Sequence, residues 1–270
     1  MKVYISVDIE GISGVVSPEQ GTPGNPDYER ARTRMTKEAN AAVLGARAAG
    51  ATDVLVNDSH GGMRNLLVEE LDTWADVVYG SPKPFSMMEG MDRSFDMAFL
   101  VGYHARAGTP SAILDHTFSG RCVAHVELNG RSVGEIGLNA ALAGIFGVPV
   151  GLVTGDRAAT AEATSLLGPN LHTVTVKEAV ANQAARCLHP EEVQSLIRQE
   201  AEQAMMTNQV EPLVLETPVT MRLMLKSSLM ADYASLIPGS RRLDGYTLEY
   251  VHDDYLTVYK VLRAMIKLAS

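Results

Sequence analysis

The sequence has little cysteine and no long hydrophobic run. Its 270 residues contain two cysteines, Cys122 and Cys187, which form neither a Cys-x-x-Cys pair nor a zinc-finger spacing. We expect both to be buried thiols in a reducing compartment. No apolar run approaches the roughly 20 residues that span a bilayer, and residues 1–8 lack the apolar core of a signal peptide. These absences predict a cytoplasmic protein.

Positive charge is also scarce. Lys and Arg number 23 against 32 Asp and Glu, which gives a formal net charge of −9, and the chain has no basic run. Such a surface repels nucleic-acid phosphates and anionic lipid headgroups, so we expect neither nucleic acid nor a membrane as a partner. The same negative charge favours the binding of cations.

Apolar residues make up 46% of the chain, enough for a globular core. Short strand-like runs alternate with longer helical patterns, and a helical pattern over 28–50 stops at a glycine. The expected strands of this region are 3–7, 54–56, 99–101, 150–153 and 173–176. Strands that alternate with helices predict a layered α/β fold with a mostly parallel sheet.

Residues 123–133 depart from this alternation. Asn129-Gly130 separates two strand-like runs, which is a strong hairpin signal, so we expect a mixed sheet or a hairpin insertion. The last third predicts a smaller α+β portion, with helices at 191–206 and 255–268 and strands at 219–223 and 246–251. We therefore expect a single unit over residues 1–270, which could divide into two lobes of about 1–190 and 191–270.

The first expected strand runs into two acidic residues, Asp8 and Glu10. Side chains alternate along a strand, so both point to the same side near its carboxyl end, where open α/β sheets bind ligands. Two close carboxylates stay ionised together only if a cation lies between them or one pKa rises. A metal site and an acid/base pair are the functional interpretations, and a solvated loop start is the alternative.

Three of the seven histidines share one placement: His60, His104 and His116 each follow a short apolar run. One such histidine would more often be a hydrogen-bonded structural residue. Three are much less expected by chance, and their imidazoles complement the carboxylates of Asp8 and Glu10. Imidazole and carboxylate are ligands that zinc uses.

Two further acids begin expected helices. Glu135 stands between two glycines in Gly134-Glu135-Ile136-Gly137, where stabilisation of the helix dipole is the default role and a metal ligand is the alternative. Asp156 lies between a strand and a helical run, which favours an N-cap. The chain has no GxGxxG, Walker or GxSxG motif.

Five segments taken together resemble the zinc-dependent D-aminopeptidases of the bacterial dipeptide-transport type. The resemblance lies in their order and spacing, and it covers most of the first 160 residues. The segments are Ser6-Val7-Asp8-Ile9-Glu10-Gly11, Asn57-Asp58-Ser59-His60-Gly61, Gly102-Tyr103-His104, Asp115-His116-Thr117 and Gly134-Glu135-Ile136-Gly137.

The resemblance implies two Zn²⁺ ions per subunit. Their implied ligands, by matching positions, are Asp8 (bridging both ions), Glu10, His60, His104 and Glu135. It also implies that His116 is an active-site residue outside the ligand set. His116 would stabilise the oxyanion or pass a proton to the leaving amine; a nucleophilic role is less economical beside an activated water.

The implied activity is that of a metallopeptidase and hydrolase, an aminopeptidase that releases N-terminal D-amino acids from short peptides such as D-Ala-D-Ala. A dizinc-activated water is the implied nucleophile, and a homodecamer of two stacked pentameric rings is the implied assembly. The alternatives are a two-metal hydrolase of another small amide or phosphate ester, and a non-enzymatic metal-bound oligomeric scaffold. A ligand set without sulfur argues against the scaffold, because structural zinc sites are usually rich in thiolate.

Overall fold

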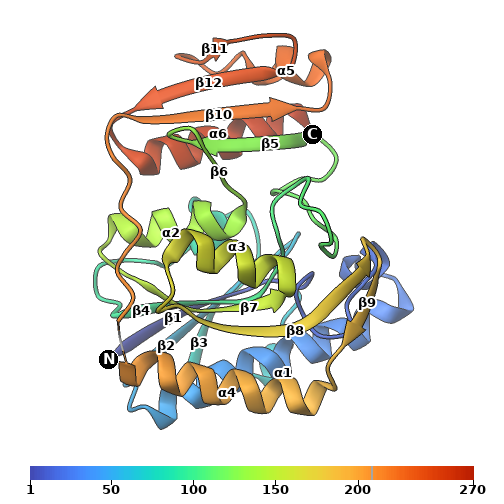
Figure 1. Ribbon diagram of the computed structural model, residues 1–270, viewed down its shortest axis with the longest axis vertical. Helices are drawn as coiled ribbons and strands as arrows, with labels where there is room; N and C mark the ends of the chain where they lie inside the picture. Colours follow the sequence, from blue (N-terminus) through green and yellow to red (C-terminus); the bar gives the residue numbers. More distant parts are fainter. Residues whose placement is uncertain (208) are drawn as a thin grey trace.

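The computed structural model describes residues 1–207 and 209–270, which form two sheets with helices packed against them (Figure 1). The larger sheet has the strand order β3-β2-β1-β4-β7-β8-β9. Its strands are β1 (Lys2–Val7), β2 (Asp53–Asp58), β3 (Ala75–Val78), β4 (Met97–Tyr103), β7 (Val150–Asp156), β8 (His172–Ala181) and β9 (Ala184–Cys187). All pairings are parallel except that of β9 with β8. The predicted α/β fold with a mostly parallel sheet is confirmed.

Helices cover both faces of this sheet. Helices α1 (Pro26–Ala48) and α4 (Pro190–Thr207) pack below it in Figure 1, and α2 (Glu135–Ile145) and α3 (Arg157–Leu167) lie above it. Because both faces are covered, the central strands β4 and β7 are buried along their whole length. Helices α1 and α4 approach closely at Gly45, where a Cβ would overlap the carbonyl oxygen of Arg198.

The second sheet is antiparallel, with the strand order β11-β12-β10-β5-β6. Its strands are β5 (Val123–Leu128), β6 (Arg131–Ser132), β10 (Val219–Leu225), β11 (Arg241–Arg242) and β12 (Thr247–His252). The β5–β6 hairpin is confirmed, with Asn129 and Gly130 both at positive φ. It pairs with β10 and extends away from the parallel sheet (Figure 1).

Helix α6 (Tyr255–Ala269) connects the two halves of the molecule. It packs against β10 and β12 of the second sheet and against α2, beside the short helix α5 (Ser228–Ala234). One hydrophobic cluster therefore runs from the second sheet through α6 to the upper face of the parallel sheet, and another lies between that sheet and α1 and α4. Short 3₁₀ helices complete the described elements: η1 (Pro18–Gly21), η2 (Val68–Glu70) and η3 (Ser86–Met88).

The two sheets draw on interleaved parts of the sequence. Helix α4 follows residue 190 and packs on the parallel sheet, whereas the hairpin at 123–132 joins strands of the C-terminal third. No helix of the described residues is long and apolar enough to cross a membrane. Both cysteines are free: Cys122 is buried as expected, but the prediction for Cys187 is wrong, because it lies exposed on the edge strand β9.

Candidate metal centre

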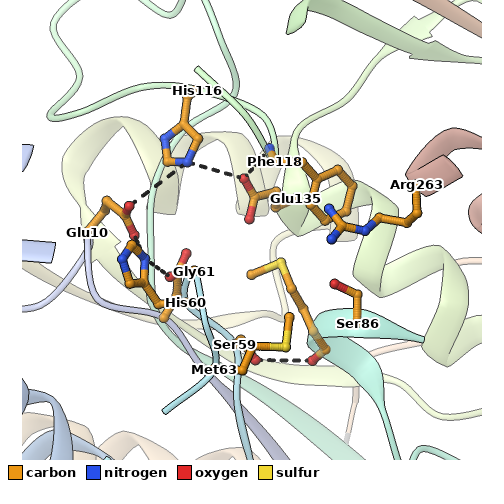
Figure 2. Close-up of a pocket in the computed structure, with 12 residues that line it drawn as sticks. Glu10, Ser59, His60, Gly61, Met63, Ser86, His116, Phe118, Glu135 and Arg263 are labelled. Carbon is orange, nitrogen blue, oxygen red and sulfur yellow. Dashed lines mark hydrogen bonds and ion pairs between the residues drawn. The ribbon is translucent and has the colours of Figure 1, made fainter. Parts of the chain in front are cut away.

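The carboxyl ends of three neighbouring strands meet at one pocket. Asp8 and Glu10 follow β1, His60 follows β2 and His104 follows β4, and the sheet places these strands side by side in the order β2-β1-β4. Glu135 enters as the first residue of α2. His116 comes from the loop between β4 and β5, and Figure 2 shows it facing Glu10 and Glu135 across the pocket.

Two glycines allow the chain to turn tightly behind Asp8 and His104. The Gly11 N–H donates to the Gly102 carbonyl at 2.8 Å. A Cβ at Gly11 would overlap the Tyr103 carbonyl oxygen, and a Cβ at Gly102, whose φ is +71°, would overlap that of Asp8. The close backbone approach therefore requires glycine at both positions, and it brings Asp8 next to His104.

Each of the three histidines has one ring nitrogen on a backbone carbonyl. His60 Nε2 lies 2.8 Å from the Gly21 carbonyl oxygen, His104 Nδ1 lies 3.0 Å from that of Ala105, and His116 Nδ1 lies 2.9 Å from that of Leu114. A carbonyl only accepts, so these nitrogens carry the hydrogen. The other nitrogen of each ring then has its lone pair directed elsewhere, as in histidines that bind metals.

The second nitrogen of each ring faces the carboxylates. His60 Nδ1 lies 2.9 Å from Glu10 Oε2 and 3.3 Å from Asp8 Oδ1. His104 Nε2 lies 3.6 Å from Asp8 Oδ2 and 3.3 Å from Glu135 Oε1. The two oxygens of Asp8 therefore face two different imidazoles, those of His60 and His104.

His116 also faces the carboxylates, but at longer distances than His60 and His104. Its Nε2 lies 3.8 Å from Glu135 Oε1 and 4.0 Å from Glu10 Oε1. Its ring stacks on that of His104, with centroids 4.0 Å apart and an interplanar angle of 11°. His116 thus reaches the carboxylates of Glu10 and Glu135 but not Asp8 within salt-bridge distance.

The electrostatics of the pocket follow from burying three carboxylates together. Burial, reinforced by the neighbouring Glu10 carboxylate, raises the pKa of Asp8 to about 8. Burial also works against ionisation of Glu10 and Glu135, but His60 and His104 outweigh it and lower the pKa of Glu10 and of Glu135 respectively. Carboxylates packed this closely require positive charge beside them, from imidazolium or from a cation.

The residues present fit a metal. His104 Nε2 is buried and has no hydrogen-bond partner, which is costly for a polar atom unless something else satisfies it. Two sets of ligand atoms lie within 4.8 Å of one another: Asp8, Glu10 and His104, and His104, His116 and Glu135. Nitrogen and oxygen donors of this kind suit zinc.

Backbone amides hold two of the carboxylates. Asp8 Oδ1 accepts from the Ile9 N–H at 2.8 Å, and Glu135 Oε1 accepts from the Phe118 N–H at 2.6 Å. Glu135 does begin a helix, as expected, but its carboxylate turns into the pocket. The dipole interpretation and the site interpretation are therefore compatible at this position.

Two other acids at strand ends, Asp156 and Asp58, accept hydrogen bonds from backbone amides. Asp156 accepts from the Ala159 N–H at 2.9 Å, which confirms the predicted N-cap of α3. Asp58 Oδ2 accepts from the Asn65 and Leu66 N–H groups and so shapes the loop that follows His60.

Three residues that the motifs did not indicate also belong to the region. Lys177 of β8 is fully buried and donates to the carbonyl oxygens of the loop after β1. Ser86 and Arg263 line the pocket from η3 and α6 (Figure 2). A lysine directly after the expected strand 173–176 is the only local signal among them, because the pocket positions of Ser86 and Arg263 depend on packing.

Comparisons with known proteins agree with this geometry. A protein-family model described as D-aminopeptidase matches residues 1–264. A D-aminopeptidase of Bacillus subtilis (strain 168) is 40% identical over 271 residues, covering 100% of this chain and 98% of the relative. The solved structure of DppA from Bacillus subtilis, a zinc-dependent D-aminopeptidase described as a self-compartmentalizing protease, superposes with a TM-score of 0.96. That match has 40% identity and covers 100% of this chain and 98% of the other.

Proposed function

Since the chain belongs to the D-aminopeptidase family of metallopeptidases, we propose that it hydrolyses short peptides with an N-terminal D-amino acid, such as D-Ala-D-Ala. We further propose two zinc ions per subunit at the candidate metal centre, and one catalytic unit over residues 1–270. The zinc dependence of the solved relative supports the choice of metal.

One observation carries the two-metal proposal. Asp8 directs Oδ1 towards His60 and Oδ2 towards His104. Asp8 would therefore bridge, with Glu10 and His60 completing one metal site and His104 and Glu135 the other. When bound, two such ions lower the pKa of a water towards neutrality and polarise the peptide carbonyl.

We propose that His116 moves protons. The hydrogen on Nδ1 is committed to the Leu114 carbonyl, so Nε2 faces the pocket between Glu10 and Glu135. In hydrolysis, the oxygen of water adds to the carbonyl carbon, the C–N bond breaks and the amine leaves with a proton. His116 Nε2 would take the proton released by the water and return it to the leaving nitrogen, or would donate to the oxyanion.

We also propose that the protein acts in the cytoplasm as a homo-oligomer, a decamer of two stacked pentameric rings. The solved relative is described as a self-compartmentalizing protease, and a compartment requires several subunits. Apolar side chains exposed on and beside the second sheet offer a surface for such contacts.

Metal content and hydrolysis measured on the same preparation test the function. We expect about two zinc ions per chain and turnover of D-Ala-D-Ala, both lost on chelation and restored by zinc. Asp8→Ala should lose both ions because the bridge is shared, whereas Asp53→Ala, an exposed acid at the start of β2, should keep them. Full zinc occupancy in Asp8→Ala, or hydrolysis of a chromogenic phosphate ester but not of D-Ala-D-Ala, would contradict the proposal.

A further inference from the structure

One side of the pocket has a chemistry that the proposed mechanism does not use. Arg263 of α6 is the sole lysine or arginine among the described residues that line the pocket, and Ser86 of η3 lines it too. Figure 2 shows both on the side away from Glu10 and His60. The pocket therefore has carboxylates and imidazoles on one side, and a guanidinium and a hydroxyl on the other.

The guanidinium of Arg263 lines the same pocket as the carboxylates without pairing with them. Its Cζ lies 4.4 Å from the centre of the Phe118 ring, and Phe118 in turn donates its backbone N–H to Glu135. No carboxylate of residues 1–207 and 209–270 lies within ion-pair distance of Arg263. Arginine stays charged at any ordinary pH, so its planar edge presents donors for a carboxylate ligand.

Ser86 adds an unsatisfied donor. The residue is 3% exposed, and its Oγ is buried without a hydrogen-bond partner in the described structure. Its φ is +51°, a backbone region that residues other than glycine and asparagine seldom adopt. Strained backbone clusters at ligand sites, and an unpaired buried hydroxyl calls for a partner from outside the chain.

We propose that Arg263, assisted by the Ser86 hydroxyl, binds the free α-carboxylate of the peptide substrate. This inference rests on the proposed function and specifies its substrate class: short peptides with an unmodified C-terminus, dipeptides above all. The guanidinium would hold the carboxylate through paired N–H···O bonds, while the scissile bond lies at the candidate metal centre.

Charge complementarity supports this assignment. A dipeptide carries a negative carboxylate at the end away from its amino group, and Arg263 supplies positive charge on the side of the pocket away from Glu10 and His60 (Figure 2). The pocket volume is about 120 Å³, which suits a small ligand. Each added residue would move the carboxylate up to about 3.6 Å away from the guanidinium, so longer peptides lose the contact.

The test compares two substrates that differ only at the C-terminus, D-Ala-D-Ala and D-Ala-D-Ala amide, on zinc-loaded enzyme. We expect the wild type to favour the free carboxylate by roughly 10- to 100-fold in kcat/KM. Arg263→Gln should remove most of that preference by raising KM for D-Ala-D-Ala, with little change for the amide. Ser86→Ala should reduce the preference by a smaller factor.

A matched control is Arg47→Gln, because Arg47 also stacks on an aromatic ring, that of Trp74, with Cζ 4.5 Å from its centre. It should keep the full preference. Equal kcat/KM for both substrates in the wild type, or an equal loss on both in Arg263→Gln, would overturn the carboxylate subsite and leave the proposed function standing. Hydrolysis of neither substrate by zinc-loaded wild type would overturn the proposed function and this inference with it.

Discussion

At the scale of single residues, the backbone decides what each histidine can do. The carbonyls of Gly21, Ala105 and Leu114 each occupy one ring nitrogen, and that choice turns the other nitrogen towards the carboxylates. His60 and His104 then lie within salt-bridge distance of Asp8, and His116 does not. Because of this difference, we propose that His60 and His104 bind metal and that His116 transfers protons.

We expect His116→Ala to keep near-normal zinc content and fold. Its kcat should fall by roughly 10²–10⁴, the range for losing an acid/base or oxyanion group, with little change in KM. His60→Ala and His104→Ala should lose zinc and activity together, because ligand loss weakens the metal site directly. The measurement is zinc content and D-Ala-D-Ala turnover on each preparation.

His125→Ala is a suitable control, since His125 lies in the second sheet and contacts Ser132 and Glu127 there. It should match the wild type in both measurements. Loss of zinc from His116→Ala would make His116 a ligand, in line with the set that it forms with His104 and Glu135. Full zinc with unchanged turnover would leave His116 without a catalytic role.

At the scale of elements, the loop between β1 and η1 is held by side chains from distant segments. Lys177 of β8 donates to the carbonyl oxygens of Glu10, Ile12 and Val15 at 2.5, 2.8 and 2.5 Å. Glu38 of α1 accepts from the Ser13 N–H of the same loop at 2.9 Å. Burial lowers the pKa of Lys177 to about 8, against the opposing effect of nearby acids such as Asp156 and Glu38.

Replacing Lys177 by methionine removes all three N–H donors; the Ile12 carbonyl keeps the Val15 N–H as a partner, whereas the carbonyls of Glu10 and Val15 lose their donor. We expect Lys177→Met to lower the free energy of unfolding by about 2–4 kcal/mol, since each unpaired buried polar group is costly. Zinc should also bind more weakly, because Glu10 belongs to the loop that loosens. Urea unfolding and zinc titration measure the two effects.

Lys267→Met, an exposed lysine near the end of α6, controls for the loss of one positive charge and should change neither quantity. Wild-type stability and zinc affinity in Lys177→Met would show that the loop keeps its shape without the ammonium group.

At the scale of the whole molecule, the second sheet and its helices project away from the parallel sheet (Figure 1). Helix α5 and the turn that follows it expose Leu229, Tyr233 and Leu236 at 63%, 53% and 69%. An apolar surface of this kind on a folded chain favours contact with another subunit. None of these three residues lines the pocket of the candidate metal centre.

We expect light scattering at micromolar concentration to show an assembly far larger than one 29.0 kDa chain. The double variant Leu229→Asp and Leu236→Asp should shift it to smaller species, because buried charges without partners destabilise an interface. Circular dichroism should show an unchanged fold in the variant. A wild-type species of a single chain would contradict the proposed ring, and an intact assembly in the double variant would place its contacts elsewhere.

Much of the site can be predicted from the sequence because its signals are local. Asp8, Glu10, His60 and His104 each follow an apolar run, and the carboxyl ends of parallel strands lie at one edge of the sheet. The hairpin at Asn129-Gly130 and the N-cap at Asp156 are local as well, since a turn or a helix start is set by a few neighbouring residues.

Other features depend on contacts between distant residues, which no local pattern records. The order β2-β1-β4 brings His60 and His104 to either side of Asp8, and the pairing of β5 with β10 builds a second sheet from separate parts of the chain. Packing of α6 against α2 carries Arg263 to the pocket, and β8 carries Lys177 to the loop after β1. The sequence by itself determined which groups could perform the chemistry, because their types and strand-end positions are local properties. Only the tertiary structure decided which groups surround them, because that depends on how the layers pack.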